Sequence, residues 1–153
     1  MAWTTPKTDW KAQYDAAGSY SGDYFDYEDY NRIKNNLKCI YDLALDFVGV
    51  LPSINFGPDK HIPNNNTPDF QNDNFFASEF NAFEEVLEAV ATAMNRNYGT
   101  NQTFYDNGKF IGYAELNRIE SATLDLYDLL VASIQGKMRL AIRFGMRAHD
   151  VRP

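Results

Sequence analysis

The phrase Tyr30-Asn31-Arg32-Ile33-Lys34-Asn35-Asn36-Leu37 decides the fold of this chain, because degenerate copies of it open two further segments. The copies read Phe80-Asn81-Ala82-Phe83, leading to Leu87, and Leu116-Asn117-Arg118-Ile119, leading to Thr123. Each copy follows an acidic residue and has a large apolar residue five positions before its first member. The apolar residues then recur at alternating spacings of three and four, which places them on one stripe of an α-helix. We therefore predict a mainly α fold, a three-helix bundle built from three related helix-opening units.

Local start and stop signals set the expected bounds of the three helices. Asp26 is a good N-cap for a first helix that runs to about Val48, and Gly49 is a plausible stop. The second helix is expected over about 77–95. The third is expected over about 113–133, and Gln135-Gly136 follows as its end.

The segments outside these helices divide the chain into an arm, a core and a tail. We predict an N-terminal arm over residues 1–24, a helical core over 25–136 and a basic C-terminal strand or tail over 137–153. The core includes a long loop at 49–74, which is rich in proline and asparagine. A loop longer than about 15 residues is unusual in a small domain. It is therefore expected to be functional or to pass over a partner.

The last segment alternates apolar and mostly basic residues, which favours a β-strand. A helix is the alternative, because Leu140 and Phe144 are four residues apart. Residues 137–153 carry five basic residues against one acid, a net charge of +4, so the other 136 residues carry −11 of the total of −7. A basic tail on an acidic body suits head-to-tail association of copies. The alternative is a tail that folds back on its own acidic helices.

The N-terminal arm carries two tryptophans and several tyrosines without a helical or strand period. Exposed tryptophan is unfavourable in water, so the arm is expected to be bound. It either folds over its own bundle or docks on a neighbouring subunit. The candidate interface residues of the arm and tail are Trp3, Trp10, Tyr14, Arg139, Arg143 and Arg147.

The chain carries little catalytic chemistry. The phosphate-loop, dinucleotide, nucleophile-elbow and zinc-protease motifs are all missing, and the two histidines and single cysteine have no obvious partners. We expect no enzyme activity, no cofactor and no metal. The glutamates Glu84, Glu85 and Glu88 are interpreted as a solvated acidic face, with a wall hydrolase as the rival hypothesis. No signal peptide or apolar membrane span is evident, and the net charge of −7 disfavours nucleic acid as a partner.

Two stretches resemble proteins of tailed phages. Residues 3–10, Trp3-Thr4-Thr5-Pro6-Lys7-Thr8-Asp9-Trp10, followed by 23–25 and 28–37, resemble the opening of small virion proteins in phages of Gram-positive and gut bacteria. Residues 114–120 are similar to a helix-opening phrase of phage tail and fibre proteins. The resemblance implies a structural component of the virion, at the tail, baseplate, neck or capsid surface.

The function expected from these observations is a non-enzymatic structural component of a phage virion, made in the host cytoplasm. Its partners would be other virion proteins and copies of itself, contacted through the arm and the C-terminal strand. The alternative is a host-receptor or carbohydrate-binding module of the tail. That module would use the aromatic and asparagine-rich loops at 52–75 and 96–110, because aromatic rings stack on sugars.

Overall fold

The structure is a computed structural model that describes residues 2–62, 66–67, 69–97, 101–108 and 111–143. These residues are mainly helical, which confirms the predicted class. The long helices are α1 (Tyr27–Val48), α3 (Ala77–Ala93) and α4 (Tyr113–Arg143), and a short helix, α2 (Phe70–Asp73), precedes α3. The described residues contain no named strand, only an isolated bridge between Tyr14 and Tyr20.

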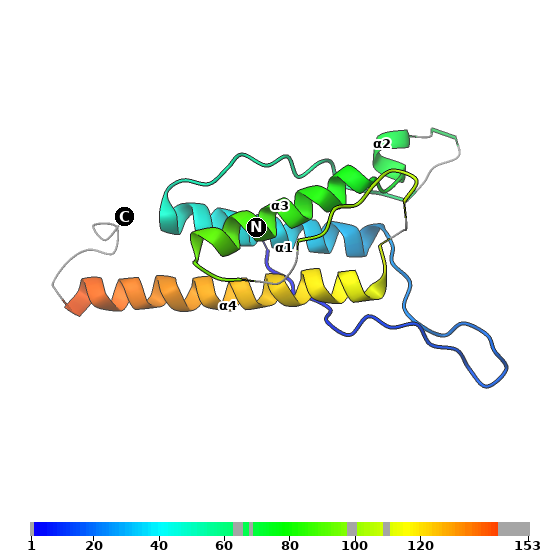
Figure 1. The fold of residues 1–153 in the computed structure, drawn as a ribbon, viewed down its shortest axis with the longest axis horizontal. Coiled ribbons are helices and arrows are strands. Elements are labelled where there is room, and N and C mark those ends of the chain that lie inside the picture. Colours follow the sequence, from blue (N-terminus) through cyan, green and yellow to red (C-terminus); the bar gives the residue numbers. More distant parts are fainter. Residues whose placement is uncertain (1, 63–65, 68, 98–100, 109–110, 144–153) are drawn as a thin grey trace.

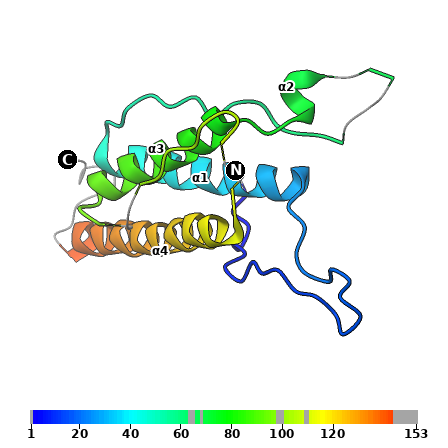
Figure 2. The same ribbon diagram turned by 45° about the vertical axis from the view of Figure 1, so that its right-hand side comes forward.

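The three long helices pack together and all begin at the same end of the molecule (Figures 1 and 2). Parallel helices require the chain to travel back after each one. Residues 49–76 return it from α1 to α3, and residues 94–112 return it from α3 to α4. A helix rises about 1.5 Å per residue, so a return past 20 residues takes about ten extended residues. The return to the start of the bundle therefore explains part of the length of the loop at 49–74.

The repeated unit is a helix-start signal. Its three acids each accept a hydrogen bond from the backbone N–H three residues earlier: Asp29 from Asp26 (3.4 Å), Glu79 from Phe76 (3.0 Å) and Glu115 from Gly112 (3.1 Å). These bonds satisfy donors that the first helical turn leaves unpaired. The apolar residues before the caps and in the first turns meet in one cluster, with the Phe75 ring 5.3 Å from Phe25 and 5.4 Å from Tyr30.

The asparagine of each unit fixes one returning segment to a helix. Each side-chain amide makes a pair of hydrogen bonds, of 2.7–2.9 Å, with the backbone N–H and C=O of a single residue: Asn31 with Lys60, Asn81 with Phe104, and Asn117 with Trp10. The first two partners lie in the segments that follow α1 and α3, whereas the third lies in the N-terminal arm. The arm thus supplies the third contact of this kind.

The predicted C-terminal strand is not found in the described residues. Residues 137–143 continue α4 without a break, so the helix does not end at Gln135-Gly136. Glycine inside a helix costs only about 1 kcal/mol relative to alanine, and the 31-residue helix α4 continues through Gly136 despite this cost. The alternation that favoured a strand is also compatible with a helix, because Met138 and Ile142 are four residues apart. Residues 144–153 lie outside the described part of the chain.

Candidate functional site

Trp10 is held inside its own chain. Its side chain is only 4% exposed, and its indole N–H donates to a carboxylate oxygen of Glu120 on α4 at 2.8 Å. The ring lies 6.1 Å from Tyr113, nearly parallel to it, and the Asn117 amide holds the Trp10 backbone on both sides. In this structure the arm is therefore folded over its own helices, which is the first of the two alternatives considered for it. The role of Trp10 in contacting a neighbour stays a prediction.

Trp3 is also placed against the body. Its ring stacks on Tyr127 of α4, with centroids 3.8 Å apart and planes at 6°. The next residue, Thr4, is fixed to α1 by a second asparagine pair, in which Asn36 accepts from the Thr4 N–H (3.0 Å) and donates to its C=O (2.6 Å). Both tryptophans are thus structural contacts within one chain.

Tyr14 differs from the tryptophans, because it lies on a hairpin that projects from the body. Residues 11–23 fold back on themselves through backbone hydrogen bonds, and the hairpin extends past the start of α1 in Figure 1. Gly18 closes the turn at a φ of 81°, where a side chain would be strained. Tyr14 is 66% exposed and meets Tyr20 edge to face at 5.4 Å. Of the three candidate interface residues of the arm, Tyr14 is the one that the fold leaves exposed to another molecule.

A buried carboxylate joins the arm to two helices. Glu120 accepts from the Lys7 backbone N–H (2.7 Å), from the Trp10 indole and from the Arg32 guanidinium of α1 (2.6 Å). Burial opposes the charge of Arg32, but its ion pairs with Glu120 and Asp29 outweigh this effect and raise its pKa. The arrangement locks the arm, α1 and α4 in one geometry.

Two of the three candidate arginines of the C-terminal end lie on α4. Arg139 is exposed on the last turns of α4. Arg143 is the last residue of that helix, and Arg147 lies outside the described residues. Met138 and Ile142, one turn apart on the same helix, are 47% and 74% exposed. The tail's basic residues therefore begin on a helix with apolar neighbours and not on a strand.

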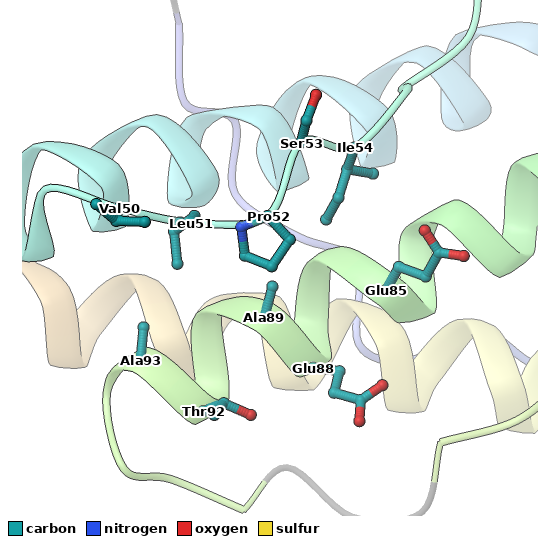
Figure 3. A pocket seen from close by; sticks show the side chains of 10 residues that line it. All are labelled: Val50, Leu51, Pro52, Ser53, Ile54, Glu85, Glu88, Ala89, Thr92 and Ala93. Carbon is teal, nitrogen blue, oxygen red and sulfur yellow. The ribbon is translucent and has the colours of Figure 1, made fainter.

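A groove runs between α3 and the segment that leaves α1 (Figure 3). Its volume is about 510 Å³, and aliphatic and small residues make up most of its lining. Figure 3 shows Pro52 and Ala89 facing each other across it, with Glu85 and Glu88 along the α3 side. No aromatic ring lines it, so it suits aliphatic side chains accompanied by positive charge. Sequence reasoning missed this groove, since only the pairing of 50–54 with α3 creates it.

The three glutamates of α3 do not form one site. Glu84 is buried and pairs with Arg118 of α4, whereas Glu85 and Glu88 are exposed at the groove. The predicted solvated acidic face therefore describes only two of the three residues. No group of three or more His, Cys, Asp or Glu residues in the described chain is arranged to hold a metal ion.

A second, smaller groove brings the two aromatic loops together. About 270 Å³ in volume, it is lined by residues of 75–80, at the start of α3, and by the turn at 104–108. Phe75, Phe76 and Tyr105 contribute rings, and Asp106 and Asn107 contribute polar groups. The residue types match those expected for a carbohydrate site.

Comparisons with protein-family models, with curated proteins and with solved structures give no match. Among the described helices, none combines the length and apolar composition needed to cross a membrane.

Proposed function

We propose that this chain is a non-enzymatic structural subunit of a phage virion, which assembles with copies of itself and with neighbouring virion proteins after synthesis in the host cytoplasm. The observation that carries the assembly role is the end of α4, where the large apolar residues Met138 and Ile142 are exposed beside Arg139. The virion itself is inferred from the resemblance of residues 3–10 and 28–37 to small virion proteins.

The internal architecture supports a rigid subunit. Buried ion pairs and asparagine contacts fix the arm and described parts of both returning segments to the helices. The projecting hairpin with Tyr14 and the end of α4 leave two separate surfaces for neighbours. A rigid body with two contact surfaces is what a structural assembly requires.

The proposal is tested by the composition of purified particles. Mass spectrometry of phage particles that carry this gene should detect the chain at a fixed ratio to the major capsid protein. A Tyr14→Ser variant should fold normally and incorporate less. We use this variant because removing residues 1–23 would also remove the buried Trp10. Particles that are complete and infectious without the chain would refute the proposal.

Carbohydrate binding is the second candidate function, favoured by the aromatic groove at Phe75, Phe76 and Tyr105. Asp106 and Asn107 beside the rings would accept and donate hydrogen bonds to hydroxyl groups. A screen against host wall polysaccharides tests it, with Tyr105→Ala as the variant that should lose binding. Binding that survives this substitution, or no binding to any polymer, would remove this candidate.

A further inference from the structure

We propose that the exposed end of α4 docks into the groove of Figure 3 on a second copy of the same chain, so that copies join head to tail. This interface deepens the proposed structural function, on which it rests, by naming the two surfaces through which copies meet. Both surfaces consist of described residues.

The end of α4 extends past the helices on which it packs (Figure 1). The ion pair between Arg32 and Glu120 places the repeated units of α1 and α4 at the same height. Counted from Tyr30 and Leu116, the first members of these units, α1 ends after 18 residues and α4 after 27. At about 1.5 Å per residue, the additional nine residues carry α4 roughly 13 Å beyond α1. This end has no accompanying helix in the described structure.

One face of this helix end is apolar and basic. Met138 and Ile142 lie one turn apart, and Arg139 lies beside them on the same exposed side. A different face turns toward the body, where the Lys137 ammonium lies 4.7 Å from the Phe47 ring centroid. The exposed pair therefore presents aliphatic side chains with a positive charge at their edge.

The groove offers the matching surface. The residues of 50–54 and the small side chains of Ala89 and Ala93 form an aliphatic floor and wall, and Glu85 and Glu88 supply negative charge along α3. A helix that lays an apolar face into a hydrophobic groove is a common mode of protein recognition. Opposite charges at the edge fix the orientation of the incoming helix.

The occupant is a second copy because the same chain cannot bring these surfaces together. Ala89 lies nine residues after the first member of its unit, Phe80, whereas Met138 lies 22 residues after Leu116. The 13-residue difference is about 20 Å along parallel helices, and α4 is continuous over this length. Its end would have to unwind to reach its own groove. The net charge of +4 on residues 137–153 against −11 on the rest also favours contact between copies.

Because the two surfaces differ, the contact is heterologous and continues into a ring or an open filament. This makes a decisive test by mixing. Ile142→Glu removes the docking face and leaves the groove, and Ala89→Arg fills the groove and leaves the docking face. Each variant alone should assemble only weakly, but each supplies the surface that the other lacks. A 1:1 pair should form in the mixture, without larger species.

The experiment measures the mass of the purified full chain by light scattering across protein and salt concentration, with circular dichroism as the check on folding. The wild type should assemble, more weakly at high salt. Each single variant should associate at least about tenfold more weakly, because it loses an apolar contact and adds a mismatched charge. Ile62→Glu is the matched control, since Ile62 is 65% exposed and lies outside both surfaces.

A monomeric wild type, unimpaired assembly of Ile142→Glu, or a mixture without the 1:1 pair would each overturn the interface. A chain ending at Arg143 should assemble like the full chain. If only that shortened chain assembled, the groove would be filled by residues 144–153 of its own copy, and the proposal would fail. Particle composition separates the two proposals. If the chain is monomeric in solution but present in particles, the structural function is supported and the interface is refuted. If the chain assembles in solution but is absent from particles, the interface is supported and the structural function is refuted.

Discussion

Replacing Glu120 by alanine should destabilise the protein more than any other single carboxylate on α4. The side chain is buried, and it accepts three hydrogen bonds at 2.6–2.8 Å from Arg32, Lys7 and Trp10. Alanine would leave the Trp10 indole N–H buried without its partner and the Arg32 charge with Asp29 as its remaining ion pair. We therefore expect the free energy of unfolding to fall by an amount near the low end of the range found when one partner of a buried ion pair is removed.

Breaking a buried pair costs about 3–5 kcal/mol, and an unsatisfied buried donor costs about 1–3 kcal/mol. Since Arg32 keeps one carboxylate, we expect the free energy of unfolding to fall by about 3 kcal/mol. Small domains have about 5–15 kcal/mol in total, so the change is easily measured. Urea unfolding at neutral pH, followed by tryptophan fluorescence, gives the value from the midpoint and slope.

The matched control is Asp128→Ala, which removes an exposed carboxylate from the same helix, outside both proposed contact surfaces, and should change stability by no more than about 0.5 kcal/mol. A double-mutant cycle with Arg32→Ala isolates the ion pair and should give a coupling energy of about 0.5–3 kcal/mol. A Glu120→Ala protein as stable as the Asp128→Ala control would refute the reasoning, since the carboxylate would then not hold the arm.

Three further predictions follow from single contacts. Asn81→Ala removes two hydrogen bonds to the returning segment and should lower the free energy of unfolding by about 1–3 kcal/mol, measured by urea unfolding. The pKa of Asp23 is lowered by the hydrogen bond from the Lys11 N–H and by Lys7, so Asp23 stabilises the hairpin above the ordinary value of 3.8 and loses this effect as pH falls through the lowered pKa. NMR shifts of the hairpin should follow that acid transition, and unchanged shifts would contradict the prediction. Burial raises the pKa of the Cys39 thiol, so alkylation at neutral pH should be slower in the folded protein than in urea.

The start of each helix could be predicted because its signal is local. The acid and the apolar residues of each unit act within one helical turn, so the sequence alone contains them. α1 follows the predicted bounds, and Gly49 adopts a left-handed φ of 88° at its end. The end of α4 was predicted wrongly, because Gly136 and the alternating residues after it are compatible with a helix as well as with a strand. Contacts with α1, such as that of Lys137, are non-local and could not be read from the pattern.

The parallel direction of the helices could not be predicted for a related reason. Asn31, Asn81 and Asn117 were visible as members of a repeat, but their partners share no residue type with one another. A backbone N–H and C=O are present at every position except proline, so a contact with the backbone leaves no trace in the partner's sequence. The groove of Figure 3 could not be predicted for the same reason, because it forms only where the backbone of residues 50–54 passes along α3.

The three units also show where the internal symmetry is broken. Arg32 of α1 pairs with Glu120 of α4, and Arg118 of α4 pairs with Glu84 of α3, from the same two positions of the unit. The third pair, from α3 to α1, would need an arginine at Ala82 and a glutamate at Lys34.

Lys34 instead pairs with Asp59, and the adjacent Lys60 pairs with Glu79 at 2.6 Å. Both bonds hold the segment that returns from α1, and the start of that segment forms one wall of the groove. Among the described residues, helices α3 and α1 thus lack the ion pair that joins the other helices, and ion pairs on this side instead hold the segment that returns from α1. The broken symmetry therefore lies on the side of the bundle where the segment leaving α1 and helix α3 line the groove that we propose receives the next copy.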